Sequence, residues 1–170
     1  MKKIIFTGPE STGKSTIAST VANFYGIEWV REYARGYLEN LGRPYQEKDL
    51  LVIAKGQWQA EQKLANLDTP FLICDTSLLV LKIWSEVKYG RCHPWILAQL
   101  QQAPATLYFL CDIDVKWEYD PLREHPQQRA ILFERYRQAL DALKVPYIII
   151  RGNKDQRKRQ VLDILSIYEK

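Results

Sequence analysis

The amino-acid sequence predicts an α/β protein with three layers, in which a five-stranded parallel sheet lies between helices on both faces. Two observations support this prediction. Short apolar runs alternate with helical patterns along the chain, which is typical of strand–helix–strand units. The apolar runs also lack the alternation of polar and apolar residues that marks a half-exposed strand, so helices are expected to cover the strands on both sides.

The expected strands are five short runs rich in apolar and β-prone residues. They cover residues 3–7, 27–30, 70–75, 106–112 and 146–150. The helices between them are predicted by apolar residues at helical spacing, by capping residues and by glycines that follow two of the helices. These helices cover residues 15–25, 33–40, 46–67, 78–89, 94–102, 127–143 and 153–168.

One segment lacks a clear period. Residues 114–126 mix charges, aromatic side chains and two prolines. We interpret this segment as a loop that can close over a site, within a lid region that spans residues 112–135.

Length and composition narrow the class of protein. The 170 residues fit a single domain, residues 1–170, and leave the oligomeric state open. No apolar run is long enough to span a bilayer, and the N-terminus leads directly into the first expected strand, so a cytoplasmic location without a membrane partner is expected. The three cysteines are odd in number and far apart, which argues against a disulfide framework and against a zinc site.

The most specific motif follows the first expected strand. Residues 8–15 read G-P-E-S-T-G-K-S, a G-x4-G-K-S spacing that opens the first helix. The two glycines let successive backbone N–H groups point into one concavity at the positive end of the helix, where the phosphates of a nucleotide fit. Lys14 would reach the β- and γ-phosphates, and the Ser15 hydroxyl would bind Mg²⁺. The predicted nucleotide-binding residues are Gly8, Glu10, Ser11, Thr12, Gly13, Lys14, Ser15 and Thr16.

Parallel sheets bind their ligands at the carboxyl ends of the strands. This rule gathers five segments at one edge, namely residues 8–16, 31–35, 75–77, 112–123 and 151–152. Phosphoryl transfer requires cations on the phosphates, an acid on the metal and a base or orienting group on the acceptor. All of these residue types occur at the predicted edge.

Three side chains at this edge join Lys14 as candidates for catalysis. Asp75 ends a strand and would be the acidic partner of the metal, although it could also cap the following helix. Glu32 would act as general base on the acceptor hydroxyl, and the alternative is a surface acid paired with Arg35. Arg123 would cover the transferring phosphate, and the alternative is a solvated arginine.

Nearby aromatic residues have two interpretations each. Trp117 and Tyr119 could stack on a flat ring, or they could simply pack within the loop. Trp58 and Trp84 lie at helical spacing among apolar residues and are expected in the core.

Basic residues outside the main motifs are expected to be solvated. Arg129 and Arg135 are weaker candidates for the phosphate and are predicted on an exposed helix face. The basic residues between 151 and 159 are also predicted on a solvated face, although a polyphosphate or an RNA end could use their charge. His93 and His125 are expected in loops, because no other histidine or cysteine stands at a metal-binding spacing from them.

Several stretches together resemble the ribosylnicotinamide kinase domain of bifunctional bacterial NAD-salvage regulators. They are the G-P-E-S-T-G-K-S loop, R-E-Y-A-R at residues 31–35, Asp75-Thr76 with Trp84 beyond it, and D-x-D…W…D-P-L-R between residues 112 and 123. The resemblance covers nearly the whole chain and implies a P-loop kinase fold with strand order 2-3-1-4-5. It also implies ATP and Mg²⁺ as partners and a small nucleoside as the acceptor, phosphorylated on its 5′-hydroxyl, with nicotinamide riboside as the leading candidate.

The same resemblance points to residues on the acceptor side. It implies that the region around Trp117 meets the nicotinamide ring. The predicted acceptor-side residues are Glu32, Tyr33, Arg35, Asp112, Asp114 and Trp117.

The chain also departs from the family pattern. The kinase domain is expected to stand alone, without the adenylyltransferase domain that precedes it in the bifunctional proteins. Lys116 stands where a proline is expected before Trp117, and Pro121 stands where a glycine is expected before Leu122.

Two other functions stay open at the level of the sequence. One is a kinase for the 5′-hydroxyl of RNA or DNA, which the basic residues 154–159 would support. The other is a regulatory ATPase whose loop at residues 114–126 responds to the γ-phosphate and engages a protein partner. The chain has no N-K-x-D signature for guanine, which favours ATP over GTP.

Overall fold

The structure, a computed structural model, describes residues 1–124 and 127–169. Five parallel strands form one sheet in the order β2-β3-β1-β4-β5, which confirms the predicted order. The strands are β1 (Lys2–Thr7), β2 (Trp29–Val30), β3 (Phe71–Asp75), β4 (Leu107–Cys111) and β5 (Tyr147–Ile150). The second strand is shorter than predicted, because at this edge of the sheet only two residues pair with β3. His125 lies outside the described residues.

A helix stands at each predicted position. The helices are α1 (Lys14–Tyr25), α2 (Tyr33–Glu39), α3 (Glu47–Ala65), α4 (Leu78–Tyr89), α5 (Pro94–Gln102), α6 (Arg129–Leu143) and α7 (Lys154–Tyr168). Gly26 and Gly90 adopt φ angles of 65° and 69° directly after α1 and α4, a left-handed conformation that glycine adopts without strain. These two ends could therefore be predicted from sequence.

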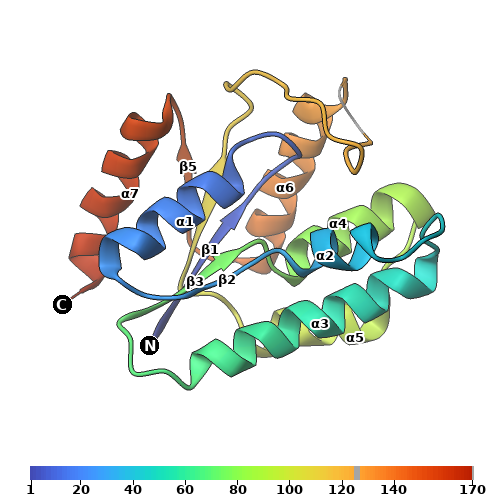
Figure 1. The fold of residues 1–170 in the computed structure, drawn as a ribbon, viewed down its shortest axis with the longest axis horizontal. Helices are drawn as coiled ribbons and strands as arrows, with labels where there is room; N and C mark the ends of the chain where they lie inside the picture. Colours follow the sequence, from blue (N-terminus) through green and yellow to red (C-terminus); the bar gives the residue numbers. More distant parts are fainter. Residues whose placement is uncertain (125–126, 170) are drawn as a thin grey trace.

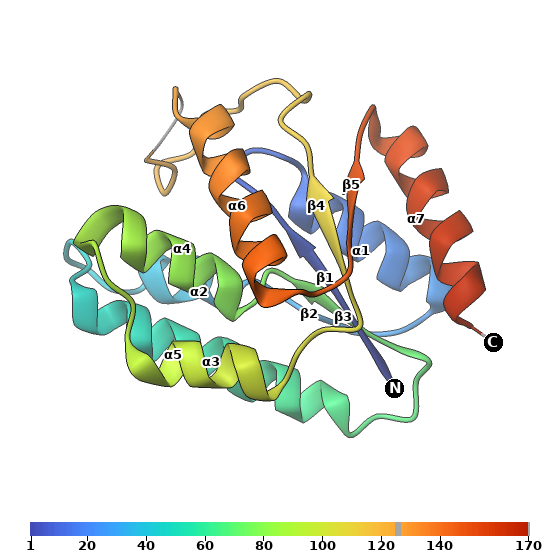
Figure 2. The same ribbon diagram turned by 180° about the vertical axis from the view of Figure 1, so that it is seen from behind.

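The helices form a layer on each face of the sheet. Helices α1 and α7 cover one face, and α2 to α6 lie on the other (Figures 1 and 2). Alternate residues of one strand enter the two cores: Ile5 packs with the α3 and α4 side, whereas Ile4 and Phe6 pack with α1 and α7. This burial on both faces explains why the strands are apolar without alternation.

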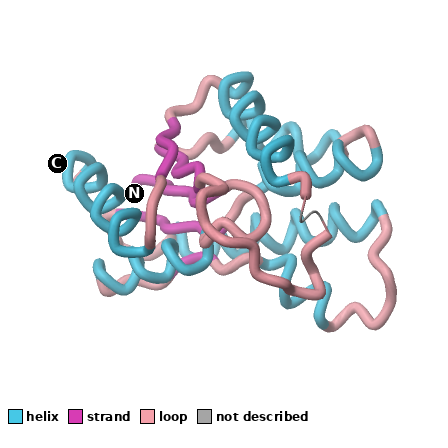
Figure 3. The backbone as a smooth tube through the Cα atoms, turned by 90° about the horizontal axis from the view of Figure 1, so that it is seen from above, coloured by secondary structure: helices cyan, strands magenta, loops and turns pink. Residues whose placement is uncertain are grey.

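The strand register determines where the loop after β1 emerges. Phe6 pairs with Asp75 of β3 on one side and with Phe109 of β4 on the other. The chain after Thr7 therefore leaves the sheet between the ends of β3 and β4. Seen from above, loops lie over the strands at this end of the molecule (Figure 3).

The predicted lid region begins as a loop. Residues 112–124 contain no helix or strand, and α6 begins at Arg129. The loop passes over the end of the sheet beside the α1 N-terminus (Figure 1).

The cysteines are free thiols. Cys74 and Cys111 are buried in the sheet and Cys92 is partly buried. Burial raises the pKa of the Cys111 thiol to about 12, so this side chain behaves as a small apolar residue. Within residues 1–124 and 127–169, no helix is both long and apolar enough to cross a membrane.

Candidate active site

The loop at residues 8–13 curls as the motif predicts. Gly8, Ser11 and Gly13 have φ angles of 134°, 54° and 79°, so backbone of the left-handed region alternates with ordinary backbone. A Cβ atom on Gly8 would lie 2.9 Å from the carbonyl oxygen of Cys111, which leaves no room for a side chain. The Thr12 hydroxyl donates to the Pro9 carbonyl at 2.8 Å and is buried. The loop is thereby held at the positive end of α1.

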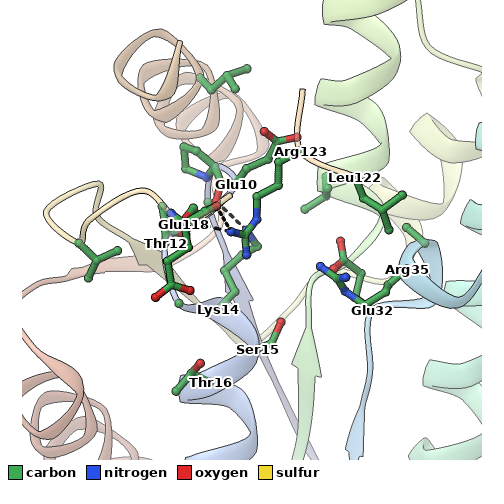
Figure 4. Close-up of a pocket in the computed structure, with 18 of the residues that line it drawn as sticks. Glu10, Thr12, Lys14, Ser15, Thr16, Glu32, Arg35, Glu118, Leu122 and Arg123 are labelled. Carbon is green, nitrogen blue, oxygen red and sulfur yellow. Dashed lines mark hydrogen bonds between the residues drawn. The ribbon is translucent and has the colours of Figure 1, made fainter. Parts of the chain in front are cut away.

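A cavity of about 500 Å³ opens beside this loop. The loop forms one wall, and Glu32 and Arg35 from the start of α2 lie across the space from Lys14 and Ser15 (Figure 4). Apolar side chains from α2, α4, the lid and α6 complete the far part of the cavity; among them are Ala34, Leu38, Val80, Ile83, Trp84, Val87, Leu122, Leu132 and Tyr136. The cavity thus joins a phosphate-binding wall to a chamber that can hold an apolar ring.

Lys14 lines the cavity and contacts its own loop. Its Nζ atom donates a hydrogen bond to the Pro9 carbonyl at 2.6 Å. This contact places the ammonium group over the loop, within the concavity where phosphates are expected.

Asp75 and Ser15 meet next to the phosphate loop. Asp75 is 3% exposed, and its Oδ1 atom has no hydrogen-bond partner among the described residues. Burial raises the pKa of Asp75 to about 6, although a hydrogen bond with the Ser15 side chain lowers it, and the negative charge of Glu32 raises it further. A buried carboxylate oxygen without a partner beside a hydroxyl is a donor set that fits Mg²⁺, which takes few protein ligands and several phosphate or water oxygens.

Asp75 does not act as a helix cap. The Ser77 hydroxyl accepts the hydrogen bond from the Leu79 N–H at 3.3 Å and caps α4. Thr76, between them, has a φ angle of 70°, and its N–H donates to the Phe6 carbonyl at 3.0 Å. The alternative interpretation of Asp75 as a cap is wrong, and its carboxylate is left for another role.

Glu32 and Arg35 do not pair with each other. Among the described residues, the Glu32 carboxylate makes no hydrogen bond or ion pair. Arg35 instead donates to Asp120 of the lid at 2.8 Å and lies 3.5 Å from Glu39. Glu32 therefore faces the cavity with a carboxylate that no described residue pairs (Figure 4).

Tyr33 points away from this cavity. Its backbone N–H donates to the Gln57 side chain at 2.9 Å, and its ring lies against Gly56 of α3. The side chain is 41% exposed and lines a shallow groove with Arg31 and Tyr37 on the outer side of α2.

The lid is tied to the phosphate loop by hydrogen bonds. The Ser11 hydroxyl accepts from the Glu118 N–H at 2.9 Å, and the Glu10 carboxylate accepts from the Glu124 N–H at 3.2 Å. Arg123 lines the cavity, and its guanidinium donates to the Glu118 carbonyl and lies 3.4 Å from the Ser11 hydroxyl. The lid thus stands over the loop with one arginine directed inward (Figure 4).

The structure separates the aromatic candidates. The centroid of the Trp117 ring lies 5.8 Å from the guanidinium carbon of Arg123 and 5.7 Å from that of Arg129. Trp117 is not among the described residues that line the cavity. Tyr119 is 86% exposed. Trp84, which the sequence places in the core, is only partly buried, and it lines the cavity. Its indole N–H donates to the Tyr45 hydroxyl at 2.8 Å.

Two arginines contradict the prediction of a solvated face. Arg129 donates to the carbonyls of Ser11 at 3.1 Å and Val115 at 2.9 Å, whereas Arg135 is exposed as predicted. Arg157 is only 3% exposed and reaches beneath the phosphate loop to the Thr12 carbonyl. Its position relative to Val161 and Leu165, at steps of four residues, was a signal in the sequence for the buried face of α7.

Asp112 and Asp114 lie between the phosphate loop and the start of α7. Asp112 accepts from Arg151 at 2.5 Å, and Asp114 accepts from the Gly152 N–H at 2.5 Å and from Arg157. Burial opposes ionisation of Asp114, but its bonds to Gly152 and Arg157 hold its pKa below the usual value. Neither carboxylate is among the described residues that line the cavity. The contacts place them beside the loop rather than beside Glu32.

Comparison with known proteins agrees with the fold. The trifunctional NAD biosynthesis/regulator protein NadR of Salmonella typhimurium strain LT2 is 25% identical over 130 residues, which cover 72% of this chain and 31% of that protein. The chain therefore spans about a third of the length of this relative. The similarity confirms the family resemblance carried by the motifs.

Solved structures share the architecture. A crystal structure of NadR protein in complex with NR superposes with a TM-score of 0.80 at 19% identity, covering 99% of this chain and 50% of that chain. A deoxyadenosine kinase from M. mycoides superposes with a TM-score of 0.67 at 14% identity, covering 97% of this chain and 99% of that chain. At these identities the likeness shows the fold, a P-loop kinase sheet with its flanking helices.

A family model described as AAA domain matches residues 3–157, from the first strand through the phosphate loop and the lid to the buried arginine of α7. Because this match covers most of the chain, the protein belongs to that AAA domain family.

Proposed function

We propose that this protein transfers the γ-phosphoryl group of ATP to the 5′-hydroxyl of a nucleoside, with nicotinamide riboside as the leading acceptor. The observation that carries the proposal is a cavity that joins the phosphate loop to Glu32 and an apolar chamber. The relatives support it, since NadR is named for NAD biosynthesis and has been crystallised with NR, and a structural neighbour is a deoxyadenosine kinase.

The phosphate loop would hold the donor. Its left-handed residues would direct backbone N–H groups toward the β-phosphate, and Lys14 would exchange the Pro9 carbonyl for phosphate oxygens. Arg123 would reach the transferring group from the lid. Ser15 and Asp75 would hold Mg²⁺, which supplies charge neutralisation on the phosphates when bound.

Glu32 would serve the acceptor. Its carboxylate has no hydrogen-bond or ion-pair partner among the described residues and lines the cavity opposite Lys14 and Ser15, where an acceptor hydroxyl would have to lie to reach the γ-phosphate. From this position it can orient the hydroxyl and accept its proton.

The apolar chamber would hold the ring of the acceptor. Trp84 offers an aromatic face, and the Glu32 and Glu124 carboxylates also line the cavity. Negative charge beside an aromatic side chain favours a flat cationic ring over a neutral one. We assign the contact with the acceptor ring to Trp84. The contact between the Trp117 region and the nicotinamide ring, which the family resemblance implies, stays a prediction. The proposal includes the expected cytoplasmic location.

The test is ADP release from ATP and Mg²⁺ with separate additions of nicotinamide riboside, a panel of ordinary nucleosides and a 5′-hydroxyl oligonucleotide. Nicotinamide riboside is expected to stimulate release strongly, and mass spectrometry should detect its phosphorylated product. Lys14→Ala should abolish the stimulation, and Lys63→Ala, an exposed lysine of α3, should leave it intact. Stimulation by the oligonucleotide alone would assign the protein to nucleic-acid ends, and release that ignores every acceptor would favour a regulatory ATPase.

A further inference from the structure

Arg157 is a buried cation that the proposed reaction does not yet use. It lies in the first turns of α7, and its side chain is 4% exposed. Its guanidinium donates to the Gly152 carbonyl at 2.9 Å, to the Asp112 carbonyl at 3.0 Å, and to the Thr12 carbonyl and the Asp114 carboxylate. One side chain thus joins the phosphate loop, the end of β4 and the turn before α7.

Stability alone is a poor explanation for this arrangement. Removing a guanidinium from water is costly, and a buried ion pair is often no more stabilising than a well-packed apolar residue of similar volume. Three of the four acceptors of Arg157 are neutral carbonyl groups, so only Asp114 balances its charge. Within the described part of α7, only Lys154 and Arg157 line the cavity.

The contact with Thr12 acts on the phosphate loop itself. The Thr12 carbonyl belongs to the same peptide unit as the Gly13 N–H, and a cation on the oxygen of a peptide strengthens its N–H as a hydrogen-bond donor. Gly13 lies directly in front of the guanidinium, since a Cβ atom there would be 3.7 Å from the Arg157 Nη1 atom. The guanidinium therefore lies on the carbonyl side of the Thr12–Gly13 peptide, and the N–H of a trans peptide points the opposite way from its carbonyl.

We propose that Arg157 is a positioning residue for the polyphosphate of the nucleotide. It fixes the Thr12–Gly13 peptide with its N–H directed into the cavity, polarises that N–H, and anchors the loop to the turn at residues 151–153. The inference rests on the nucleotide-binding part of the proposed function and is independent of the identity of the acceptor.

The test compares Arg157→Gln with Arg159→Gln, an exposed arginine of the same helix that undergoes the same change of charge. Calorimetry with Mg²⁺ gives the dissociation constants of ATP and of inorganic tripolyphosphate, which has no base. Loss of a charged hydrogen bond to the loop should weaken both ligands by a similar factor, on the order of tenfold or more. Arg159→Gln should bind both ligands as the wild type does.

Other outcomes would overturn the proposal. A lower melting temperature with unchanged dissociation constants would make Arg157 a purely structural residue. Weaker binding of ATP with unchanged binding of tripolyphosphate would show that Arg157 acts on the base of the nucleotide. Equal weakening in Arg159→Gln would show that only the overall positive charge of the helix matters.

If Arg157→Gln does not fold, Arg157→Lys is tested by the same measurements. Lysine keeps the charge but cannot contact all three carbonyls, so binding equal to that of the wild type would contradict the proposal. These binding measurements use no acceptor nucleoside. They therefore test the role of Arg157 even if no nucleoside stimulates ADP release.

Discussion

The guanidinium of Arg129 donates a hydrogen bond to the Ser11 carbonyl at 3.1 Å, and it donates another to the Val115 carbonyl at 2.9 Å. The first residue of α6 therefore ties the lid to the phosphate loop. Trp117 packs against the same guanidinium, with 5.7 Å between the ring and the central carbon. This arginine therefore contacts the lid and the phosphate loop at the same time.

Loss of the hydrogen bond between Arg129 and Ser11 should reduce the catalytic efficiency with ATP. We expect Arg129→Gln to lower kcat/KM for ATP on the order of tenfold, because the loop carbonyl loses a charged hydrogen bond. Arg135→Gln, on the exposed face of the same helix, should leave kcat/KM unchanged. Steady-state kinetics with varied ATP measures both. Equal effects of the two changes would show that net charge on α6 matters and that the contact with Ser11 does not.

Asp75 should limit the stability of the metal-free protein. Its pKa of about 6 lies above that of an unfolded aspartate near 3.9, so between these values the folded state binds more protons than the unfolded state. Stability should therefore fall as the pH rises from about 4 to 6 and stay lower above, with an upper limit of about 3 kcal/mol at one pKa unit per ~1.4 kcal/mol.

The variant Asp75→Asn removes this buried charge. Without Mg²⁺, denaturant unfolding should show the variant more stable than the wild type at neutral pH, with the difference vanishing near pH ~4. The same variant should lose Mg²⁺-dependent ATP turnover, because the metal loses its acidic ligand. Asp68→Asn, at an exposed position, is the matched control. A variant that is less stable than the wild type at both pH values would contradict the assignment of a costly buried carboxylate.

Gly8 should tolerate no side chain. In Gly8→Ala the φ angle of 134° and the Cys111 carbonyl at 2.9 Å from the new Cβ atom both oppose the change, so we expect a loss of about 2 kcal/mol or more in the free energy of unfolding. Gly36→Ala is the control, because that glycine lies in α2 with open space around it, and alanine there should stabilise the helix by ~0.5–1 kcal/mol. Thermal unfolding of both variants measures the contrast. A small loss of stability in Gly8→Ala would mean that the phosphate loop can move away from β4.

Much of the fold could be predicted because its signals are local. Each strand is covered on both faces and is therefore an unbroken apolar run, and Gly26 and Gly90 mark helix ends by their own conformational preference. The phosphate loop is equally local, since its residues are consecutive and its shape follows from two glycines.

The remaining parts of the site depend on contacts between distant segments. Arg157 resembles a solvated residue within a basic stretch, and only the carbonyls of Thr12, Asp112 and Gly152 explain its burial. Trp84 follows a helical apolar pattern like a core residue, yet the arrangement of α2, α4 and the lid leaves it beside the cavity. Such contacts cannot be inferred from the sequence of one segment, because the groups that each side chain contacts belong to a distant segment.

Glu32 provides the sharpest test of the proposed chemistry. Its carboxylate lines the cavity across from Lys14 and Ser15 and, among the described residues, has no hydrogen-bond or ion-pair partner to lose, so Glu32→Gln changes charge and basicity with little effect on packing. If Glu32 takes the proton of the acceptor hydroxyl, kcat for nucleoside phosphorylation should fall on the order of 100-fold. KM for ATP should stay near the wild-type value, since the donor binds at the phosphate loop.

Two controls separate this role from a general effect of charge. Glu28→Gln removes an acid at an exposed position that is not among the residues lining the cavity, and it should behave as the wild type. ATP binding by Glu32→Gln, measured by calorimetry with Mg²⁺ and without a nucleoside, should also be unchanged, because the donor binds at the phosphate loop. Near-normal phosphorylation by Glu32→Gln would exclude Glu32 as the base. The proton of the acceptor would then have to pass directly to the phosphate, as a loose transition state with late proton transfer allows.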